Sequence, residues 1–509
     1  MTQQMAPRHK GAGALSAVHE LKTLVLSRHP GILIETPEPE RAERSLVEVG
    51  RDLQLIRFRW SVTSGLRRAR EGGPAYETQD PARALAAIAE MGVDGLYELH
   101  DFTPYLDKPE VLRALLELLE RFAGPGSRLS TVVLLESAAK LPPELDAHVV
   151  RYHLRFPSRD EYRGALEAVV KSLRVNGAVV EIDPADYDEF CGAVTGLTLN
   201  QARQAIARAG IEDGRLTRDD LARLAELKAR ALQEDGLLEY FPPADNRYEL
   251  GGFGGLTRWL ERARVGFSAE AAELGLEPPK GILLVGVQGC GKSLAAKVIA
   301  REWRLPLLKL DAGRLFDKFI GETERNFRKA IDIAEATAPA VLWIDEIEKA
   351  IAPGGEGETD GGLSRRLFGS FLTWLQEKTE PVFVVATAND LSLLPPELLR
   401  KGRFDEIFFV DLPNDAEREQ IVRIHLGLRK QDPAGFDVSA LVAASDGFSG
   451  AEIEQAVIAS LLGALHDGVP LSTSALVQEL GATVPLSVAR REDVAALRAL
   501  AEGRFVAVR

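Results

Sequence analysis

Residues 281–293 are Gly-Ile-Leu-Leu-Val-Gly-Val-Gln-Gly-Cys-Gly-Lys-Ser, and this stretch decides the fold. A short apolar run of strand length leads into G-x-x-x-x-G-K-S, and a helical pattern follows from Leu294 to Trp303. In that order, the glycines let backbone N–H groups surround phosphate oxygens at a helix N-terminus. Lys292 can reach the β and γ phosphates, and Ser293 can bind Mg²⁺. We therefore predict a phosphate-binding loop; a plain glycine-rich turn is the alternative. The residues of the loop that we predict to contact the nucleotide phosphates are Gly286, Val287, Gln288, Gly289, Cys290, Gly291, Lys292, Ser293 and Leu294.

A second run, Val341-Leu-Trp-Ile-Asp-Glu346, has the pattern of a buried strand that ends in two acids. Asp345 would hold Mg²⁺ through water, and Glu346 would orient or deprotonate the water that attacks the phosphate. A solvated strand end can show the same pattern. The distance along the chain from Lys292 to Asp345 and Glu346 nevertheless suits an enzyme with a phosphate-binding loop. We therefore predict that both acids belong to the phosphate site.

The sequence repeats itself about 250 residues apart. Gly31-Ile-Leu-Ile matches Gly281-Ile-Leu-Leu, and Leu141-Pro-Pro-Glu-Leu145 recurs as Leu394-Pro-Pro-Glu-Leu398. Two further pairs follow in the same order, 156–161 with 412–417 and 196–202 with 447–453. Short apolar strands alternate with helical patterns, which predicts two α/β units with largely parallel sheets, each followed by a small helical region. Chance similarity among common βα sequences is the alternative.

The first copy lacks the residues that would bind phosphate. In place of the loop it has Thr36-Pro-Glu-Pro-Glu-Arg-Ala42, whose glutamates would repel phosphate. Ala42 and Glu43 stand where the second copy has its lysine and serine, and His100 stands where it has its metal-binding aspartate. We predict that His100 is a hydrogen-bonded residue at a strand end and not a ligand. Residues 19–235 are then a degenerate domain that packs, recruits or regulates without a nucleotide site.

Composition limits the remaining function classes. The chain has 509 residues, is 45% hydrophobic and carries a formal net charge of −14. At about 150 residues per domain, this length suggests roughly three folded units. The acidic balance disfavours a nucleic-acid partner. Cys191 and Cys290 lie far apart, so we expect no disulfide framework, no cysteine-based zinc site, and a reducing compartment, the cytoplasm. No apolar run approaches the roughly 20 residues of a membrane span, so no membrane partner is expected.

From about Tyr248 to Leu465 the sequence resembles the AAA ATPases of the AAA+ superfamily. The resemblance implies ATP and Mg²⁺ as cofactors. It implies that Asn389, in Ala386-Thr-Ala-Asn389, positions the attacking water. It also implies that Gly450 and Ala451 belong to a lid segment near the adenosine.

Residues 398–405 resemble the second region of homology of these ATPases. The two arginines of that region, here Arg400 and Arg403, usually point into the nucleotide site of a neighbouring subunit. An arginine from a neighbour would stabilise charge on the transferring phosphoryl group. A surface pair of salt-bridge donors is the alternative.

Residues 317–323 resemble the first central-pore loop of the family, in which an aromatic residue grips a threaded polypeptide. The corresponding residues are Lys318, Phe319, Ile320 and Gly321. A core phenylalanine ahead of a helix is the alternative. Residues 354–362, with five glycines and three acids, are either a second pore loop or a plain connector.

More narrowly, the phosphate loop, Leu342-Trp-Ile-Asp-Glu and residues 365–376 resemble an AAA group typified by an uncharacterised chloroplast-encoded reading frame and its bacterial relatives. Cys290 stands where threonine is frequent in AAA proteins. A partly exposed thiol beside phosphate would be sensitive to oxidation, although a small filler residue is the simpler interpretation.

The predicted fold class is α/β, with a P-loop AAA+ core and helical lid preceded by a degenerate AAA-like α/β domain that lacks the P-loop. The predicted segments are a flexible tail (1–18), the degenerate domain (19–235), a linker (236–250), the large ATPase domain (251–412), the helical lid (413–480) and a C-terminal extension (481–509).

The leading functional hypothesis is an ATP-hydrolysing homo-oligomeric ring, expected to be a hexamer, that remodels or unfolds a protein client threaded past Phe319. A nucleotide-gated scaffold or switch with slow hydrolysis is the second hypothesis. A nucleic-acid motor is the third, and the acidic balance disfavours it.

Overall fold

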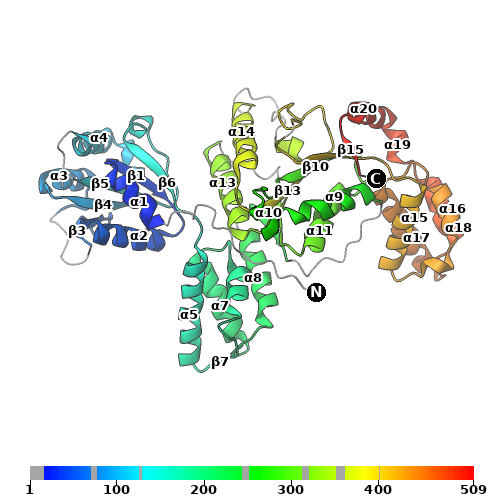
Figure 1. Cartoon of the computed structure of the whole chain (residues 1–509), viewed down its shortest axis with the longest axis horizontal. Coiled ribbons are helices and arrows are strands. Elements are labelled where there is room, and N and C mark those ends of the chain that lie inside the picture. The colour runs from blue at the N-terminus through cyan, green and yellow to red at the C-terminus, as the bar shows by residue number, and fades with distance from the viewer. Residues whose placement is uncertain are drawn as a thin grey trace. The chain divides into compact units, whose positions relative to one another are not determined.

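The computed structural model of the chain describes residues 17–69, 77–124, 129–234, 236–242, 252–311, 320–350, 361–400 and 402–508. The chain divides into two compact units, and the boundary lies between Ser158 and Arg159 (Figure 1). The boundary therefore falls inside the range 19–235, which the sequence assigns to one domain.

The first unit contains a six-stranded sheet in the order β3-β2-β4-β5-β1-β6. Its strands are β1 (Gly31–Glu35), β2 (Ile56–Trp60), β3 (Arg67–Arg68), β4 (Gly95–His100), β5 (Ser130–Glu136) and β6 (Val149–His153). All pairings are parallel except that of β3 with β2. The central strands β4, β5 and β1 are buried along almost their whole length because helices cover both faces of a parallel sheet.

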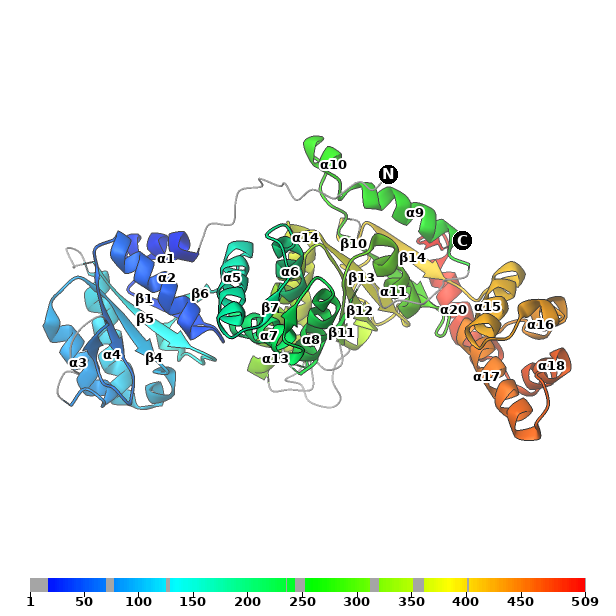
Figure 2. The ribbon, with the colours of Figure 1, turned by 90° about the horizontal axis from the view of Figure 1, so that it is seen from below.

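Helices cover both faces of this first sheet (Figure 2). They are α1 (Ala17–Leu26), α2 (Pro39–Asp52), α3 (Pro81–Met91) and α4 (Pro109–Ala123), with the short 3-10 helices η1 (Thr103–Asp107) and η2 (Pro143–Leu145). Leu21 of α1 and Leu46 of α2 share a core cluster with Ile32. Leu85 of α3 and Leu115 of α4 belong to a separate cluster on the other face.

The second unit contains a seven-stranded sheet in the order β15-β14-β10-β13-β12-β11-β9. Its strands are β9 (Leu238–Phe241), β10 (Gly281–Gly286), β11 (Leu307–Asp311), β12 (Ala340–Asp345), β13 (Val382–Ala388), β14 (Glu406–Val410) and β15 (Val506–Ala507). Only β9 runs antiparallel to its neighbour. The order β11-β12-β13-β10-β14 repeats the order β2-β4-β5-β1-β6 of the first unit, so the duplication predicted from sequence extends to strand topology.

Helices also lie on both sides of the second sheet (Figure 1). They are α9 (Gly254–Val265), α10 (Ala269–Glu273), α11 (Lys292–Trp303), α13 (Ile320–Thr337) and α14 (Gly361–Glu377), with the 3-10 helix η3 (Ile347–Ala350). Leu256 of α9 and Trp303 of α11 share one core cluster with Phe383 of β13. On the other side, Phe327 of α13 stacks edge-on against Phe371 of α14.

Two helical bundles complete the second unit. The first contains α5 (Arg159–Val175), α6 (Tyr187–Val194), α7 (Leu199–Glu212) and α8 (Asp220–Glu234), with the short strands β7 (Val179–Val180) and β8 (Arg215–Leu216). The second contains α15 (Asp415–Leu428), η4 (Pro433–Gly435), α16 (Val438–Ala444), α17 (Gly450–Asp467) and α18 (Thr473–Ala482). Corresponding helices are in contact in both bundles, and a capping box opens both α7, at Thr198, and α17, at Ser449. The duplication therefore includes the helical regions.

Part of the predicted linker 236–250 is a strand. Leu238–Phe241 forms β9 and pairs antiparallel with β11, and its alternate residues Leu238 and Tyr240 are buried. Residues 243–250 lie outside the described part of the chain.

The C-terminal extension also joins the sheet. It contains the helices α19 (Leu486–Ala489) and α20 (Arg491–Ala501). It also contains β15, which pairs in parallel with β14. The carbonyl of the buried Val508 accepts the backbone N–H groups of Gly255 and Leu256 at 2.8 and 3.1 Å. The last residues of the described chain are thus tied to the start of α9.

Within the described ranges, no helix combines the length and the apolar character that a bilayer crossing requires.

A buried lysine lies where the first bundle meets β9. Lys228 of α8 is 1% exposed, and its Nζ lies 4.5 Å from the centre of the Tyr240 ring. Burial lowers the pKa of this ammonium to about 7. In the unfolded chain a lysine keeps its proton up to about pH 10. Between these values the unfolded state binds the extra proton, so stability rises with pH.

We therefore expect Lys228→Met to raise the melting temperature at pH 7, by roughly 2 to 8 °C, and to flatten its rise towards pH 9.5. Calorimetry across this pH range measures both effects. Lys171→Met, which changes an exposed lysine of α5, is the matched control and should shift the melting temperature by less than about 1 °C. A Lys228→Met melting temperature below the parent value would show that the charged form is stabilised.

Candidate functional site

The predicted phosphate loop lies between β10 and α11, in the strand–loop–helix order expected from sequence. Gly286 ends β10 with φ +146°, and a Cβ there would lie 2.0 Å from the Val410 carbonyl oxygen. Gly291, with φ +87°, is the N-cap of α11. A side chain is excluded by contact at the first position and strained at the second, so the backbone of the loop depends on these glycines.

The ammonium of Lys292 lies within this loop. Lys292 is 6% exposed, and its Nζ donates to the carbonyl oxygens of Gly286 and Val287, both at 2.8 Å. Burial is the main reason that the pKa of Lys292 is lowered to about 8, while nearby acids partly oppose this effect. Because carbonyl oxygens hold the ammonium here, phosphate oxygens would have to replace them as its partners.

Three side chains meet at the carboxyl ends of β12 and β13, next to α11. The Ser293 Oγ donates to the Asp345 Oδ1 at 3.0 Å, and the Thr387 Oγ1 donates to the same atom at 2.7 Å. Hydroxyl and carboxylate oxygens are the ligands that Mg²⁺ prefers, so Ser293 and Asp345 fit the metal. Thr387 is a residue that sequence reasoning missed; the only signal was a hydroxyl in an otherwise apolar strand.

Glu346 follows Asp345 in a left-handed backbone conformation, with φ +51°. Its backbone N–H donates to the Thr387 Oγ1 at 3.0 Å, which holds this uncommon conformation in place. The Asn389 side-chain amide donates to the Glu346 Oε1 at 2.9 Å, and Lys349 forms an ion pair with the same carboxylate. The structure therefore brings the predicted base and the predicted water-positioning residue together.

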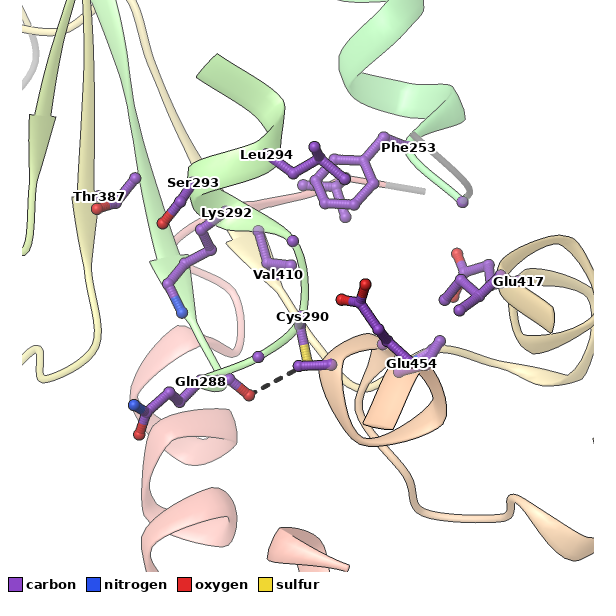
Figure 3. A pocket seen from close by; sticks show the side chains of 18 of the residues that line it. Phe253, Gln288, Cys290, Lys292, Ser293, Leu294, Thr387, Val410, Glu417 and Glu454 are labelled. Carbon is purple, nitrogen blue, oxygen red and sulfur yellow. Dashed lines mark hydrogen bonds between the residues drawn. The ribbon is translucent and has the colours of Figure 1, made fainter. Parts of the chain in front are cut away.

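A cavity of about 430 Å³ connects the phosphate loop to the second bundle (Figure 3). The residues predicted from sequence that line it are Gln288, Gly289, Cys290, Gly291, Lys292, Ser293, Leu294, Asp345, Glu346, Asn389, Gly450 and Ala451. The backbone N–H of Ala451 donates to the Gly289 carbonyl at 3.0 Å, so the start of α17 touches the loop. Sequence reasoning missed the rest of the lining, which includes Phe253, Thr387, Ile421, His425 and Glu454.

The sequence suggested that Cys290 is partly exposed, but the structure shows that it is buried. It is 8% exposed, its thiol lies 3.8 Å from the Gln288 carbonyl oxygen, and burial raises the pKa of the thiol to about 12 (Figure 3). A buried protonated thiol reacts slowly with oxidants. This geometry favours the small filler residue over a redox sensor.

Arg400 and Arg403 lie outside the cavity of their own chain. Arg400 is exposed, and Arg403 is half-buried with an Nη1 that has no hydrogen-bond partner among the described residues. The prediction that they act on a neighbouring subunit stays a prediction.

The pore-loop residues Lys318 and Phe319, and residues 354–360, lie outside the described part of the chain. Ile320 and Gly321 begin α13.

In the first unit, other side chains occupy the positions that correspond to the nucleotide site. The Arg41 guanidinium donates to the carbonyl oxygens of Arg155 and Phe156. Glu43 forms an ion pair with Arg59, and its Oε1 lies 3.8 Å from the His100 Nε2.

His100 lies at a strand end, as predicted, but its Nε2 does not form the hydrogen bond that was expected with any of the described residues. Its Nε2 is buried without a hydrogen-bond partner in the described chain, and burial together with Arg59 lowers the pKa of its imidazole. A neutral imidazole therefore ends β4 where the second copy has a carboxylate.

Family comparisons agree with this geometry. Residues 282–412 match the ATPase family associated with various cellular activities (AAA). Residues 17–154 match the N-terminal domain, and 160–235 the second domain, of SpoVK-like AAA ATPases. The fold and the site thus define an AAA ATPase domain preceded by SpoVK-like domains.

Full-length relatives narrow the family further. The chain is 36% identical to the uncharacterized AAA domain-containing protein ycf46 of Guillardia theta, over 94% of each chain. It is 35% identical to ycf46 of Pyropia yezoensis, over 96% of this chain and 99% of the relative. The proteasome-activating nucleotidase of Thermococcus onnurineus is 35% identical over 42% of this chain and 56% of its own length. The chain belongs to the AAA ATPase family, in the group of ycf46 AAA domain-containing proteins.

Proposed function

We propose that the protein is a Mg²⁺-dependent ATPase whose subunits form a ring, a hexamer, that remodels or unfolds a protein client. The observation that carries this proposal is the junction of Ser293, Asp345, Glu346 and Asn389 at the carboxyl ends of β12 and β13. The matches to proteasome-activating nucleotidases support a protein as the client. The two buried, unpaired cysteines among the described residues suit a cytoplasmic location.

The site offers the groups that ATP hydrolysis needs. Ser293 and Asp345 would hold Mg²⁺, and a bound Mg²⁺ neutralises charge on the phosphates. Glu346 would accept the proton of the attacking water, and Asn389 would hold that carboxylate and the water in place. Lys292 would exchange its carbonyl partners for the β and γ phosphate oxygens.

We propose that residues 19–235 do not hydrolyse ATP and instead pack, recruit or regulate. Support comes from the guanidinium of Arg41 at the start of α2 and from Glu43 and His100, which replace the serine and the aspartate of the second copy. A chain truncated to 244–509 that kept full assembly and partner binding would contradict this assignment.

Replacing Phe319 with alanine should abolish threading and spare hydrolysis. We expect at least a tenfold loss of ATP-dependent unfolding, because an aromatic anchor is lost, with an ATPase rate within about threefold of the parent. The assay follows the fluorescence of a folded reporter protein that carries a disordered polypeptide tail. Unfolding at the parent rate in Phe319→Ala would rule out threading past this residue.

The second candidate is a nucleotide-gated scaffold with slow hydrolysis. The observation that favours it is the engagement of both reactive groups by the chain itself: Glu346 by Asn389 and Lys349, and Lys292 by loop carbonyls. If these contacts persist with ATP bound, hydrolysis would be slow. In that case the parent chain would bind ATP and change partners without unfolding the reporter.

A further inference from the structure

A second glutamate, Glu348, lies beside the catalytic groups without lining the cavity. It is two residues after Glu346 in η3 and is 5% exposed. Its Oε1 accepts the backbone N–H of Asn389 at 2.8 Å. Its Oε2 is buried and has no hydrogen-bond partner among the described residues.

Burying such a carboxylate costs free energy. Burial raises the pKa of Glu348, and the charge of Glu346 raises it further, whereas the backbone N–H groups of Asn389 and of Glu348 itself and the charge of Lys292 partly offset these effects. A buried oxygen without a hydrogen-bond partner is costly even where the other oxygen of the same carboxylate is paired. A native group of this kind calls for an explanation beyond stability.

The hydrogen bonds around Glu348 supply that explanation. Glu348 holds the backbone of Asn389, and the Asn389 side chain in turn holds the Glu346 Oε1 at 2.9 Å. Glu346 and Glu348 follow β12, whereas Asn389 follows β13. The two bonds therefore tie the ends of neighbouring strands together on either side of the predicted base.

We propose that Glu348 is a positioning residue for ATP hydrolysis: it fixes the backbone of Asn389 so that the side-chain amide stays on the Glu346 carboxylate. This inference rests on the proposed ATPase function. Glu348 touches neither the cavity nor the reacting atoms, so it acts through Asn389.

The test uses the full chain and two substitutions, Glu348→Ala and Glu348→Gln. Alanine removes the acceptor for the Asn389 N–H, and we expect kcat for ATP to fall about 10- to 100-fold with KM within about threefold. Glutamine keeps an oxygen acceptor in the same place. We therefore expect Glu348→Gln to stay within about threefold of the parent kcat.

A double-mutant cycle with Asn389→Ala separates positioning from a general structural effect. If Glu348 acts through Asn389, adding Glu348→Ala to Asn389→Ala should lower kcat by less than about twofold. The matched control is Glu136→Gln in the first unit, another buried carboxylate, which accepts the N–H groups of Phe102 and Thr103 at 2.7 and 2.9 Å. Its kcat should equal that of the parent.

The possible outcomes test two separate claims, the positioning role of Glu348 and the proposed ATPase function. Parent-like kcat in Glu348→Ala, or full additivity with Asn389→Ala, would overturn the positioning role and leave the ATPase function standing. Loss of activity in Glu348→Gln as large as in Glu348→Ala would overturn it as well, because the acceptor is then not what matters. A parent chain that does not hydrolyse ATP would overturn the proposed function, and the inference with it.

Discussion

Replacing Glu346 with glutamine should slow ATP hydrolysis by about 10²- to 10⁴-fold while ATP binding is retained. Glutamine has nearly the same shape and still offers an oxygen to the Asn389 amide, which lies 2.9 Å from Glu346 Oε1 in the parent. It cannot accept the proton of the attacking water, so the general-base contribution is lost. Phosphate release gives the rate, and equilibrium binding of a fluorescent ATP analogue gives the affinity.

The matched comparison is Lys292→Ala, which should lose ATP binding itself because the ammonium at the phosphate loop is removed. If Glu346→Gln hydrolysed ATP at the parent rate, the assignment of Glu346 as the base would be wrong. A variant that binds ATP without hydrolysing it should also retain clients. Pull-down with Glu346→Gln in ATP, followed by identification of the retained proteins, would name them.

Replacing Arg403 with alanine should lower kcat by about 10³- to 10⁵-fold if its guanidinium stabilises charge in a neighbouring subunit's site. Its Nη1 is buried and has no hydrogen-bond partner among the described residues, and the residue lies outside the cavity of its own chain. The matched control is Arg423→Ala, which removes an exposed pair with Glu419 within α15 and should leave kcat within about twofold.

Subunit mixing shows whether Arg403 acts on a neighbour. Arg403→Ala subunits keep an intact phosphate loop, and Lys292→Ala subunits keep the arginine. In a head-to-tail ring made from equal amounts of the two, about a quarter of the sites would have both parts, so roughly a quarter of the parent activity should return. No recovery on mixing would mean that the arginine does not act between subunits. Arg400→Ala can be examined in the same way.

The parts of the site that sequence predicted are local in the chain. The strand, the glycine loop and Lys292 lie within one short segment, and Asp345 and Glu346 end one buried strand, so their neighbours are fixed by chain order. The largely parallel sheets could be predicted as well, because alternating strand and helix patterns lead to parallel sheets. The order of the strands comes from the structure alone.

Residues whose role depends on long-range register could not be predicted. Thr387 matters because the register of β13 against β12 places its hydroxyl 2.7 Å from Asp345 Oδ1, and Glu348 matters because η3 turns it towards Asn389. Burial is another property that sequence does not give. Cys290 looked partly exposed beside a loop, yet the surrounding core encloses it.

The two outermost strands of the second sheet were missed for a related reason. β9 and β15 are very short, with weak apolar patterns, and each forms only because an existing edge offers unpaired N–H and C=O groups. Such strands are specified by their partner more than by their own residues.

The left-handed backbone at Glu346 has a counterpart in the first unit. Asp101, which follows His100 at the end of β4, has the same φ of +51°. There the neighbouring histidine replaces the carboxylate, so no metal chemistry explains the conformation. The same torsion angle in both copies shows that this turn does not depend on the residues proposed to bind nucleotide. A positive φ at this position therefore cannot distinguish a copy that has those residues from a copy that lacks them.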